Sequence, residues 1–207
     1  SSYLKLVLLT GCRPGEALNM RWVDVDFRWN ALVMRDKVEG ERTIPLTPYL
    51  AALLRDLAIR NETPPKPPRR LRAALGDINA GSKQWTPSAW VFRSATSASG
   101  RLSDVSHANH RALTAAGLPH ITPHGLRRSF GTLAEWVEVP VGIVAQIQGH
   151  KPSAIAEKHY RVRPLDLLRM WHERIEAWVL VEAGIALPEK KAAGRSIRIA
   201  SKTALVD

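Results

Sequence analysis

Two short β-type runs, set between helical patterns, constrain the fold of this chain more than any other feature. Residues 32–37 and 42–46 read as strands that are joined through residues 38–41. Gly40 supplies the left-handed backbone freedom that a tight connection needs. The sequence therefore predicts one β-hairpin, and with it a small antiparallel sheet.

Helical patterns lie on both sides of this hairpin. Thr122 suits an N-cap and Pro123 the first position of a helix, and Ser103 is expected to cap another. The other helices are expected at about residues 3–9, from the Arg13 turn through Trp22, and at 47–60, 140–148 and 164–182, with a short third strand at 90–92. The predicted fold class is mainly α with a small antiparallel β-sheet (α+β).

A proline-rich segment interrupts these patterns. Residues 61–70 contain four prolines, which remove backbone donors and fix φ, so no regular structure is expected there. Arg69 and Arg70 make the segment basic. It can serve as a solvated connector or as a basic contact to a polyanionic partner.

Composition limits the partner and the compartment. The chain of 207 residues has 30 Lys and Arg against 19 Asp and Glu, a net charge of +11, which attracts a polyanion such as nucleic acid. Hydrophobic residues make up 45% and there are 7 tryptophans, so a substantial core is expected rather than a small RNA-binding module. A single cysteine excludes an internal disulfide, and we expect a cytoplasmic protein without a membrane segment.

Arginine and histidine gather in two short clusters. Arg13 stands in a Gly/Pro-marked break just ahead of an apolar helical pattern, with Glu16 one helical turn beyond it. His124 and Arg127, three apart, are expected on one face of the first turn of a helix, followed by Arg128. A helix N-terminus that carries a histidine and an arginine suits a phosphate.

A third cluster surrounds a tyrosine. His150 and Lys151 follow Gly149, and Tyr160 comes ten positions after His150, next to a histidine and an arginine. A phenol with a pKa of about 10 is a poor nucleophile at neutral pH unless cations and proton-transfer groups surround it. The other two tyrosines, Tyr3 and Tyr49, lie in apolar helical patterns and are expected to pack in the core.

Taken in order, these clusters resemble the catalytic set of the tyrosine recombinases, the phage integrase family. The resemblance rests on Arg13 in T-G-x-R-x-x-E, the H-x-x-R of His124 and Arg127, the G-H of His150, and Tyr160. It implies a catalytic domain over residues 1–188, with the N-terminal core-binding domain of the family absent, and a basic tail at 189–207. Lys37 then matches the family's hairpin lysine.

The resemblance also implies a site-specific recombinase or integrase that breaks and rejoins DNA through a 3′-phosphotyrosine intermediate. Arg13 and Arg127 would clamp the phosphate, Tyr160 would attack, and Lys37 would protonate the leaving 5′ oxygen. His124 would assist proton transfer, His150 would donate to the phosphoryl group, and Glu16 would orient Arg13 or His124. Arg69, Arg70, Arg128 and Lys151 are weaker candidates for DNA contacts.

The implied partner is double-stranded DNA, bound by a homotetramer that exchanges C-terminal helices; without DNA the chain can be a monomer. The helical stripe that would serve such an exchange, or pack on its own core, comprises Leu165, Leu168, Trp171, Ile175 and Trp178. No cofactor is expected. His107, His110 and His120 lack the accompanying ligands of a standard zinc site.

Each cluster has a simpler interpretation when it is taken alone. Arg13 can cap a helix, His124 and Arg127 can be surface groups, and the Gly-His pair can be a helix C-cap. Two other functions remain open: a type IB-like DNA topoisomerase of the same chemistry, and a non-catalytic helix-turn-helix binder built from residues 133–149.

Overall fold

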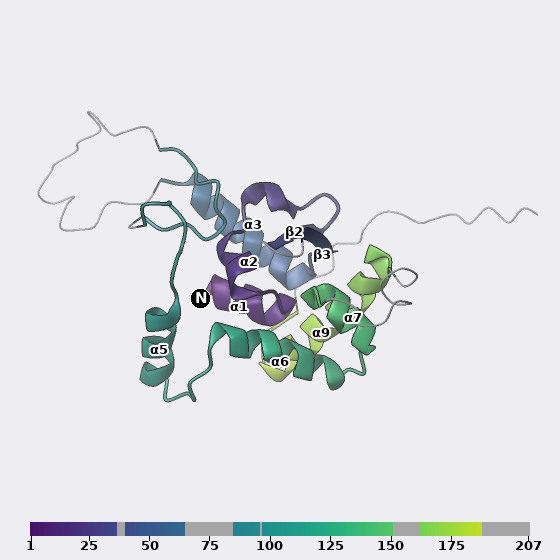
Figure 1. Cartoon of the computed structure of the whole chain (residues 1–207). Helices are drawn as coiled ribbons and strands as arrows, with labels where there is room; N and C mark the ends of the chain where they lie inside the picture. The colour runs from purple at the N-terminus through teal and green to yellow at the C-terminus, as the bar shows by residue number, and fades with distance from the viewer. Residues whose placement is uncertain (37–39, 65–84, 96, 151–161, 188–207) are drawn as a thin grey trace, which may run out of the picture.

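A computed structural model of the chain describes residues 1–36, 40–64, 85–95, 97–150 and 162–187 (Figure 1). The fold class predicted from the sequence is confirmed: helices surround one small antiparallel sheet. The described elements are α1 (Ser2–Thr10), α2 (Pro14–Leu18), a 3-10 turn η1 (Trp22–Asp24), β1 (Val25–Asp26), β2 (Ala31–Asp36), β3 (Gly40–Pro45), α3 (Pro48–Glu62), α5 (Ser106–Ala115), α6 (Pro123–Glu135), α7 (Val141–Gln148) and α9 (Leu165–Glu182).

The sheet has the order β1-β2-β3, and both pairs are antiparallel. β2 and β3 form the predicted hairpin, with Leu32 opposite Ile44. The third strand predicted at residues 90–92 is wrong, because β1 takes that place in the sheet. Val91 and Phe92 are consecutive and both buried, whereas neighbouring residues of a strand point to opposite faces. Only single bridges form there, one of them between Trp90 and Arg21.

Several predicted helix ends are shifted by local side-chain hydrogen bonds. The helix predicted to run through Trp22 ends at Leu18, and Asn19 bonds back to the carbonyl of Gly15. The helix predicted to be capped by Ser103 begins at Ser106, whose N–H donates to Asp104. Helix α3, by contrast, is longer than predicted: it extends through Glu62, two residues into the segment that was expected to be irregular.

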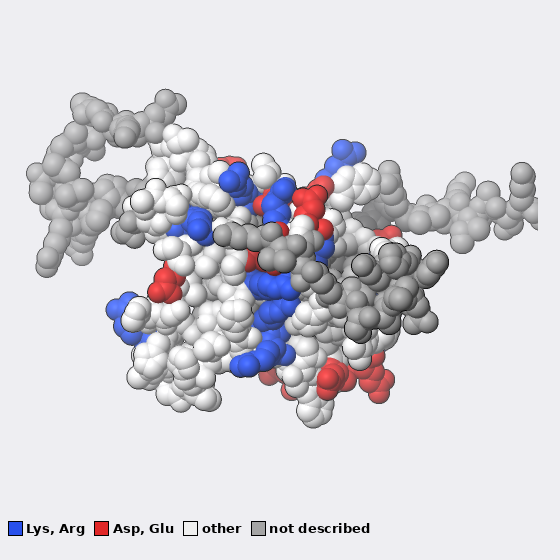
Figure 2. Space-filling view, in the orientation of Figure 1, with Lys and Arg blue, Asp and Glu red and all other residues white. Residues whose placement is uncertain are grey.

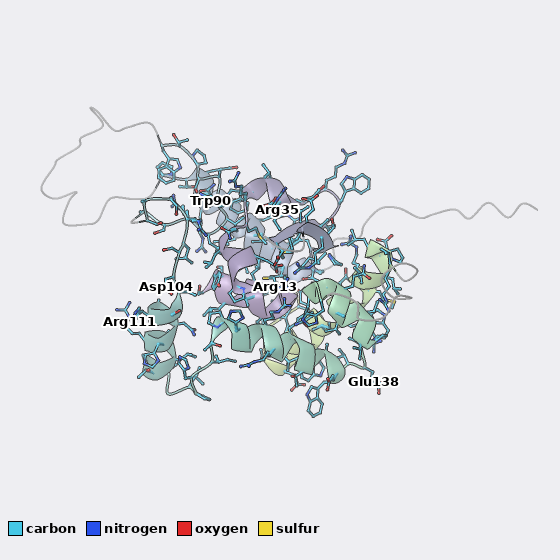
Figure 3. All side chains as sticks on the ribbon, in the orientation of Figure 1. Arg13, Arg35, Trp90, Asp104, Arg111 and Glu138 are labelled. Atoms are coloured by element: carbon cyan, nitrogen blue, oxygen red, sulfur yellow. The ribbon has the colours of Figure 1, made fainter. Side chains whose placement is uncertain are left out.

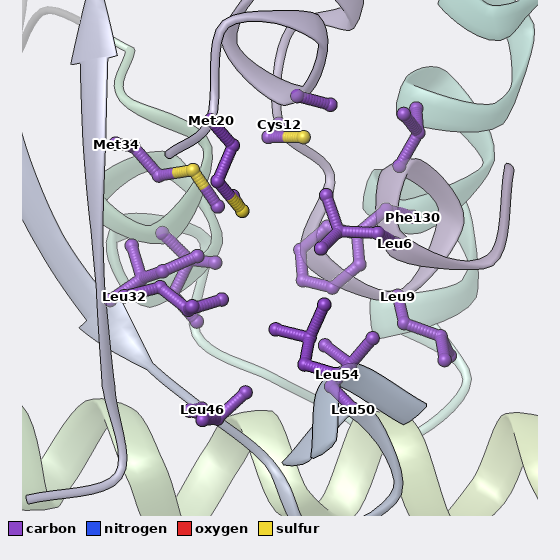
Figure 4. Close-up of a cluster of buried hydrophobic side chains, with 14 of the residues drawn as sticks. Leu6, Leu9, Cys12, Met20, Leu32, Met34, Leu46, Leu50, Leu54 and Phe130 are labelled. Carbon is purple, nitrogen blue, oxygen red and sulfur yellow. The ribbon is translucent and has the colours of Figure 1, made fainter. Parts of the chain in front are cut away.

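The core lies between α1, the hairpin, α3 and the face of α6 that carries Phe130 (Figure 4). Leu6 is fully buried on α1, as are Leu50 and Leu54 on α3. α1 packs against α6 along its length, and α9 packs against β3. Because α1 packs against α6, the turn that joins α1 to α2 lies beside α6.

Helix α9 anchors itself to this core with both apolar and polar groups. Leu168 and Ile175 of the predicted stripe are buried, while the tryptophans of the stripe are only half-buried. Glu176 is also buried and accepts from the N–H groups of Tyr49 and Leu50 at 2.8 and 3.2 Å. It thus supplies from a distant helix the N-terminal cap that α3 does not obtain from its own N-cap side chain.

Among the described residues, no helix is both long and apolar enough to cross a membrane.

Candidate active site

The site is built around the sharp turn between α1 and α2. Gly11 ends α1 in the left-handed conformation, with φ of 59°. A Cβ at this position would lie 2.5 Å from the ring of Phe130 and 2.9 Å from the side-chain nitrogen of Gln148, so only glycine fits both the backbone and the space. Cys12 follows and is fully buried, and burial raises the pKa of its thiol to about 11. The next residue, Arg13, is the N-cap of α2.

Arg13 points its guanidinium across to two other elements. Its Nη1 donates to Oδ2 of Asp36, at the end of β2, over 3.0 Å. Its Nη2 donates to the carbonyl of Gly149, just beyond α7, over 3.4 Å. The side chain keeps 32% of its surface exposed.

Arg127 enters the same region from α6. Thr122 caps this helix as predicted, because its hydroxyl accepts from the N–H of Gly125. Arg127 itself is buried, and its Nη1 donates to the carbonyls of Gly11 and Gln148 at 2.6 and 2.9 Å. Burial is the largest cause that lowers the pKa of Arg127, and the positive charge of Arg13 is the next. Two cations are therefore held close enough to repel each other.

Glu16 offsets part of this charge from the first turn of α2. Its carboxylate accepts from the backbone N–H of Arg13 at 2.7 Å and lies 3.5 Å from Nη1 of the same residue. The stronger contact is with Arg42 on β3, which donates to both carboxylate oxygens at 2.6 and 2.9 Å. Arg42 was not among the site residues predicted from the sequence. Its strand register held a signal, since Arg42 is two residues before buried Ile44 and therefore faces the same side of the sheet.

The other predicted residues of α6 and α7 lie at the surface. His124 and Arg128 are exposed on α6, whereas Arg127 between them is buried, so His124 and Arg127 have different surroundings. His150 is exposed and follows Gly149, which ends α7 with φ of 75°. Figure 3 places Arg13 at the centre of the face in view, and Figure 2 shows a column of Lys and Arg side chains there.

Comparison with known proteins assigns the chain to a protein family. The model of the phage integrase family matches residues 1–164. The chain belongs to the phage integrase family. A curated relative in this family, the prophage integrase IntF of Escherichia coli (strain K12), is 56% identical over 187 residues. The alignment covers 90% of this chain and 36% of that protein, so the chain spans about a third of the length of that relative.

Solved structures of similar fold include a phage integrase and a site-specific recombinase. The integrase from mycobacterium phage Brujita superposes with a TM-score of 0.58 at 20% identity, covering 84% of this chain and 50% of the other. The XerH site-specific recombinase, bound to its difH substrate, superposes with a TM-score of 0.53 at 19% identity, covering 80% and 44%. At these identities the likeness concerns the fold.

Some positions of the integrase set lie outside the described residues. These are Lys37, Tyr160 and the candidate DNA contacts Arg69, Arg70 and Lys151. Asp36, which directly precedes Lys37, is described and contacts Arg13. The proposed tail at 189–207 is likewise outside the described part of the chain. Within the described part, no group of His, Cys, Asp and Glu residues has the arrangement of a metal site.

Proposed function

We propose that this chain is the catalytic part of a site-specific DNA recombinase or integrase, which breaks and rejoins DNA through a 3′-phosphotyrosine intermediate. The observation that carries this proposal is the convergence of Arg13 and Arg127 on the end of α7, with Arg13 partly exposed. Both guanidinium groups bond to neighbouring carbonyls of this helix end, Gly149 and Gln148, and their positive charges repel each other. Asp36 and Glu16 offset part of this positive charge, and a bound anion would offset more of it.

A phosphodiester is the anion that fits this chemistry. Its two non-bridging oxygens repel a nucleophile, and planar guanidinium forks neutralise such oxygens with directed hydrogen bonds. Arg13 and Arg127 would therefore stabilise the extra negative charge of the transition state. Exposed His150, one residue beyond Gly149, would donate a further hydrogen bond to the same group.

Tyr160 would carry out the attack on this phosphate. Its phenolic oxygen forms the new bond to phosphorus as the bond from phosphorus to the 5′ oxygen breaks, which leaves the DNA 3′ end on the tyrosine. The phenolic proton would pass to His124, and Lys37 would give a proton to the departing 5′ oxygen. The reverse sequence, with a new 5′ hydroxyl as nucleophile, rejoins the strand.

We propose double-stranded DNA as the partner, bound by a homotetramer. The net charge of +11 and the basic column around Arg13 support a polyanionic ligand (Figure 2). An exchanged C-terminal helix would join the protomers, and the half-buried tryptophans of α9 offer apolar surface for it. Without DNA the chain would be a monomer. The longer relative leaves room for a core-binding domain that would close the complex around the duplex.

A non-catalytic helix-turn-helix binder would use α6 and α7 to recognise DNA. In this chain, however, the end of α7 supplies the carbonyls that hold Arg13 and Arg127. A binder has no need for this arrangement, whereas a phosphate-cleaving site does. We therefore favour the enzyme.

The test is incubation with a suicide DNA substrate, in which a nick next to the cleavage site lets the released fragment diffuse away and traps the covalent product. We expect a protein–DNA band that survives denaturation. Tyr160→Phe removes the nucleophile and keeps the arginines, so DNA binding should persist while the band disappears. A band that persists in Tyr160→Phe would contradict the assignment of the nucleophile, and no band with the unchanged protein would contradict the proposed function.

A further inference from the structure

We infer that Arg42 is a positioning residue of this site, which holds Glu16 and the end of α7 so that Arg13 and His150 meet the same phosphate. The inference rests on the proposed function. It goes beyond it because Arg42 belongs to none of the residues that the cleavage chemistry employs. The Arg42 side chain extends into the site from β3, whereas Arg13 comes from the turn before α2.

The end of α7 is the point at which three arginines meet. Three successive carbonyl groups each accept from a different guanidinium: Ile147 from Arg42 at 3.0 Å, Gln148 from Arg127 at 2.9 Å, and Gly149 from Arg13 at 3.4 Å. The last carbonyls of a helix have no partner within it and carry partial negative charge, so they attract cations. This helix end therefore fixes the relative positions of all three side chains.

All three nitrogens of the Arg42 guanidinium donate to other groups of the protein. Its Nε donates to Ile147, and its Nη1 and Nη2 donate to the two oxygens of Glu16. Only 17% of its side chain is exposed, against 32% for Arg13. With Nε, Nη1 and Nη2 bonded to Ile147 and Glu16, this guanidinium holds other groups of the site in place.

The first group that Arg42 holds is the carboxylate of Glu16, whose side chain is 2% exposed. A buried carboxylate needs a partner, because leaving its charge unpaired in the interior is strongly destabilising. With Arg42 in place, Glu16 also accepts from the backbone N–H of Arg13 and stays 3.5 Å from its Nη1. Without Arg42, the carboxylate would turn to the Arg13 guanidinium and neutralise part of the phosphate clamp.

The second group is the chain around Gly149. A Cβ at this position would lie 2.7 Å from Cζ of Arg42, so the absence of a side chain lets the guanidinium lie against the backbone. The positive φ of Gly149 then turns the chain toward His150, whose N–H donates back to Ala145. Arg42 thus supports the residue that sets the direction of His150.

The proposed role depends on the planar guanidinium of Arg42, so a substitution that keeps the positive charge but removes the guanidinium tests it. Arg42→Lys keeps the charge but cannot donate to both Glu16 oxygens and to Ile147 at once. Arg35→Lys is the matched control: Arg35 lies on the same hairpin and pairs through Nε with buried Asp24, away from the Arg13 cluster. Both variants are compared with the unchanged protein for melting temperature, DNA affinity and the rate of covalent adduct formation.

We expect Arg42→Lys to form the adduct about 10- to 100-fold more slowly, the scale of a small misplacement of catalytic groups, with the fold retained and the DNA affinity lowered far less than the rate. Arg35→Lys should cleave at the normal rate. Adding Glu16→Gln to Arg42→Lys should then speed cleavage, because it removes the charge that competes for Arg13, whereas Glu16→Gln alone should slow it. A merely structural role for Arg42 would not produce this reversal of sign.

Hydrogen exchange provides a readout that does not depend on cleavage. In Arg42→Lys the amides of residues 147–150 should exchange faster, while those of α1 stay protected and Arg35→Lys changes neither. Unchanged exchange at residues 147–150, a normal cleavage rate in Arg42→Lys, or no reversal with Glu16→Gln would each overturn the inference. If the unchanged protein formed no adduct, the proposed function would fail instead, and the exchange data would still decide whether Arg42 holds this segment.

Discussion

Arg13 and Asp36 form an ion pair in the candidate active site, with 3.0 Å between Nη1 and Oδ2. Asp36 is the last residue of β2 and has 13% of its side chain exposed. A carboxylate offers a guanidinium the same pair of anionic oxygens that a phosphate does. Asp36 therefore occupies the donor that a scissile phosphate would need under the proposed function, and the bound DNA would have to displace it.

Replacing Asp36 by Asn should tighten DNA binding. The amide oxygen is a weaker partner for Arg13 than the carboxylate, so less is lost when the phosphate takes its place. For a partly exposed pair we expect a gain of about 0.5–1 kcal/mol, roughly a two- to fivefold lower Kd at low salt. Asp56→Asn removes an equally negative but exposed side chain on α3 and serves as control. Equal gains in both variants would mean that net charge alone is responsible.

Arg13→Lys should abolish most of the cleavage activity while the protein remains folded. A lysine ammonium cannot donate to Asp36 and Gly149 with the spacing of a guanidinium fork, nor bind a phosphate oxygen in the same geometry. Loss of one such electrostatic donor typically slows a reaction by about 100- to 1000-fold. The measurement is the adduct rate on a suicide substrate, with circular dichroism to verify the fold. A variant that cleaves within about threefold of the normal rate would contradict a clamp role for Arg13.

The sequence predicted those parts of the fold and site that depend on neighbouring residues. The hairpin follows from two strand-like runs around Gly40, and α6 begins where Thr122 and Pro123 mark a start. Arg13 and Arg127, singled out on their motifs, lie at the same helix end. Their catalytic roles, and that of Tyr160, stay predictions.

The long-range contacts of the site could not be predicted from the sequence, because no local pattern of residues encodes them. Arg42 reads as an ordinary strand residue until β3 is placed beside α2, 26 positions away along the chain. Asp36 likewise acquires its role only when the hairpin meets the Arg13 turn. The third strand was misplaced because residues 90–92 have strand-like composition. In the structure the edge strand is β1, which lies much nearer to β2 along the chain.

Removing the Glu176 carboxylate should destabilise the protein through α3. Glu176 accepts from the hydroxyl of Thr47 and from two backbone N–H groups in the first turn of that helix. Glu176→Ala leaves these donors without a partner in a region shielded from water, which should cost about 2–4 kcal/mol. Urea unfolding measures the loss. Glu182→Ala, at the exposed end of the same helix, should change stability by less than about 0.5 kcal/mol.

His172 should make the folded state sensitive to acid. The ring is fully buried beneath Phe130, and its Nε2 lies 2.7 Å from the carbonyl of Leu9. A carbonyl only accepts, so Nε2 carries the proton of a neutral imidazole. Burial, which opposes the charged form, lowers the pKa of His172 from 6.5 to about 4.

The sign of the effect follows from proton binding in the two states. Between pH 6.5 and about 4 the unfolded chain binds a proton at His172 and the folded chain does not, so stability falls as the pH decreases through this window. From pH 7.5 to 4.5 the loss from this residue should be about 2–3 kcal/mol. His172→Gln keeps a donor for Leu9 but cannot titrate, so its stability should depend less on pH by that amount. The exposed His107→Gln should retain the full dependence, and equal slopes for all three proteins in urea unfolding would show that His172 is not the acid-sensitive group.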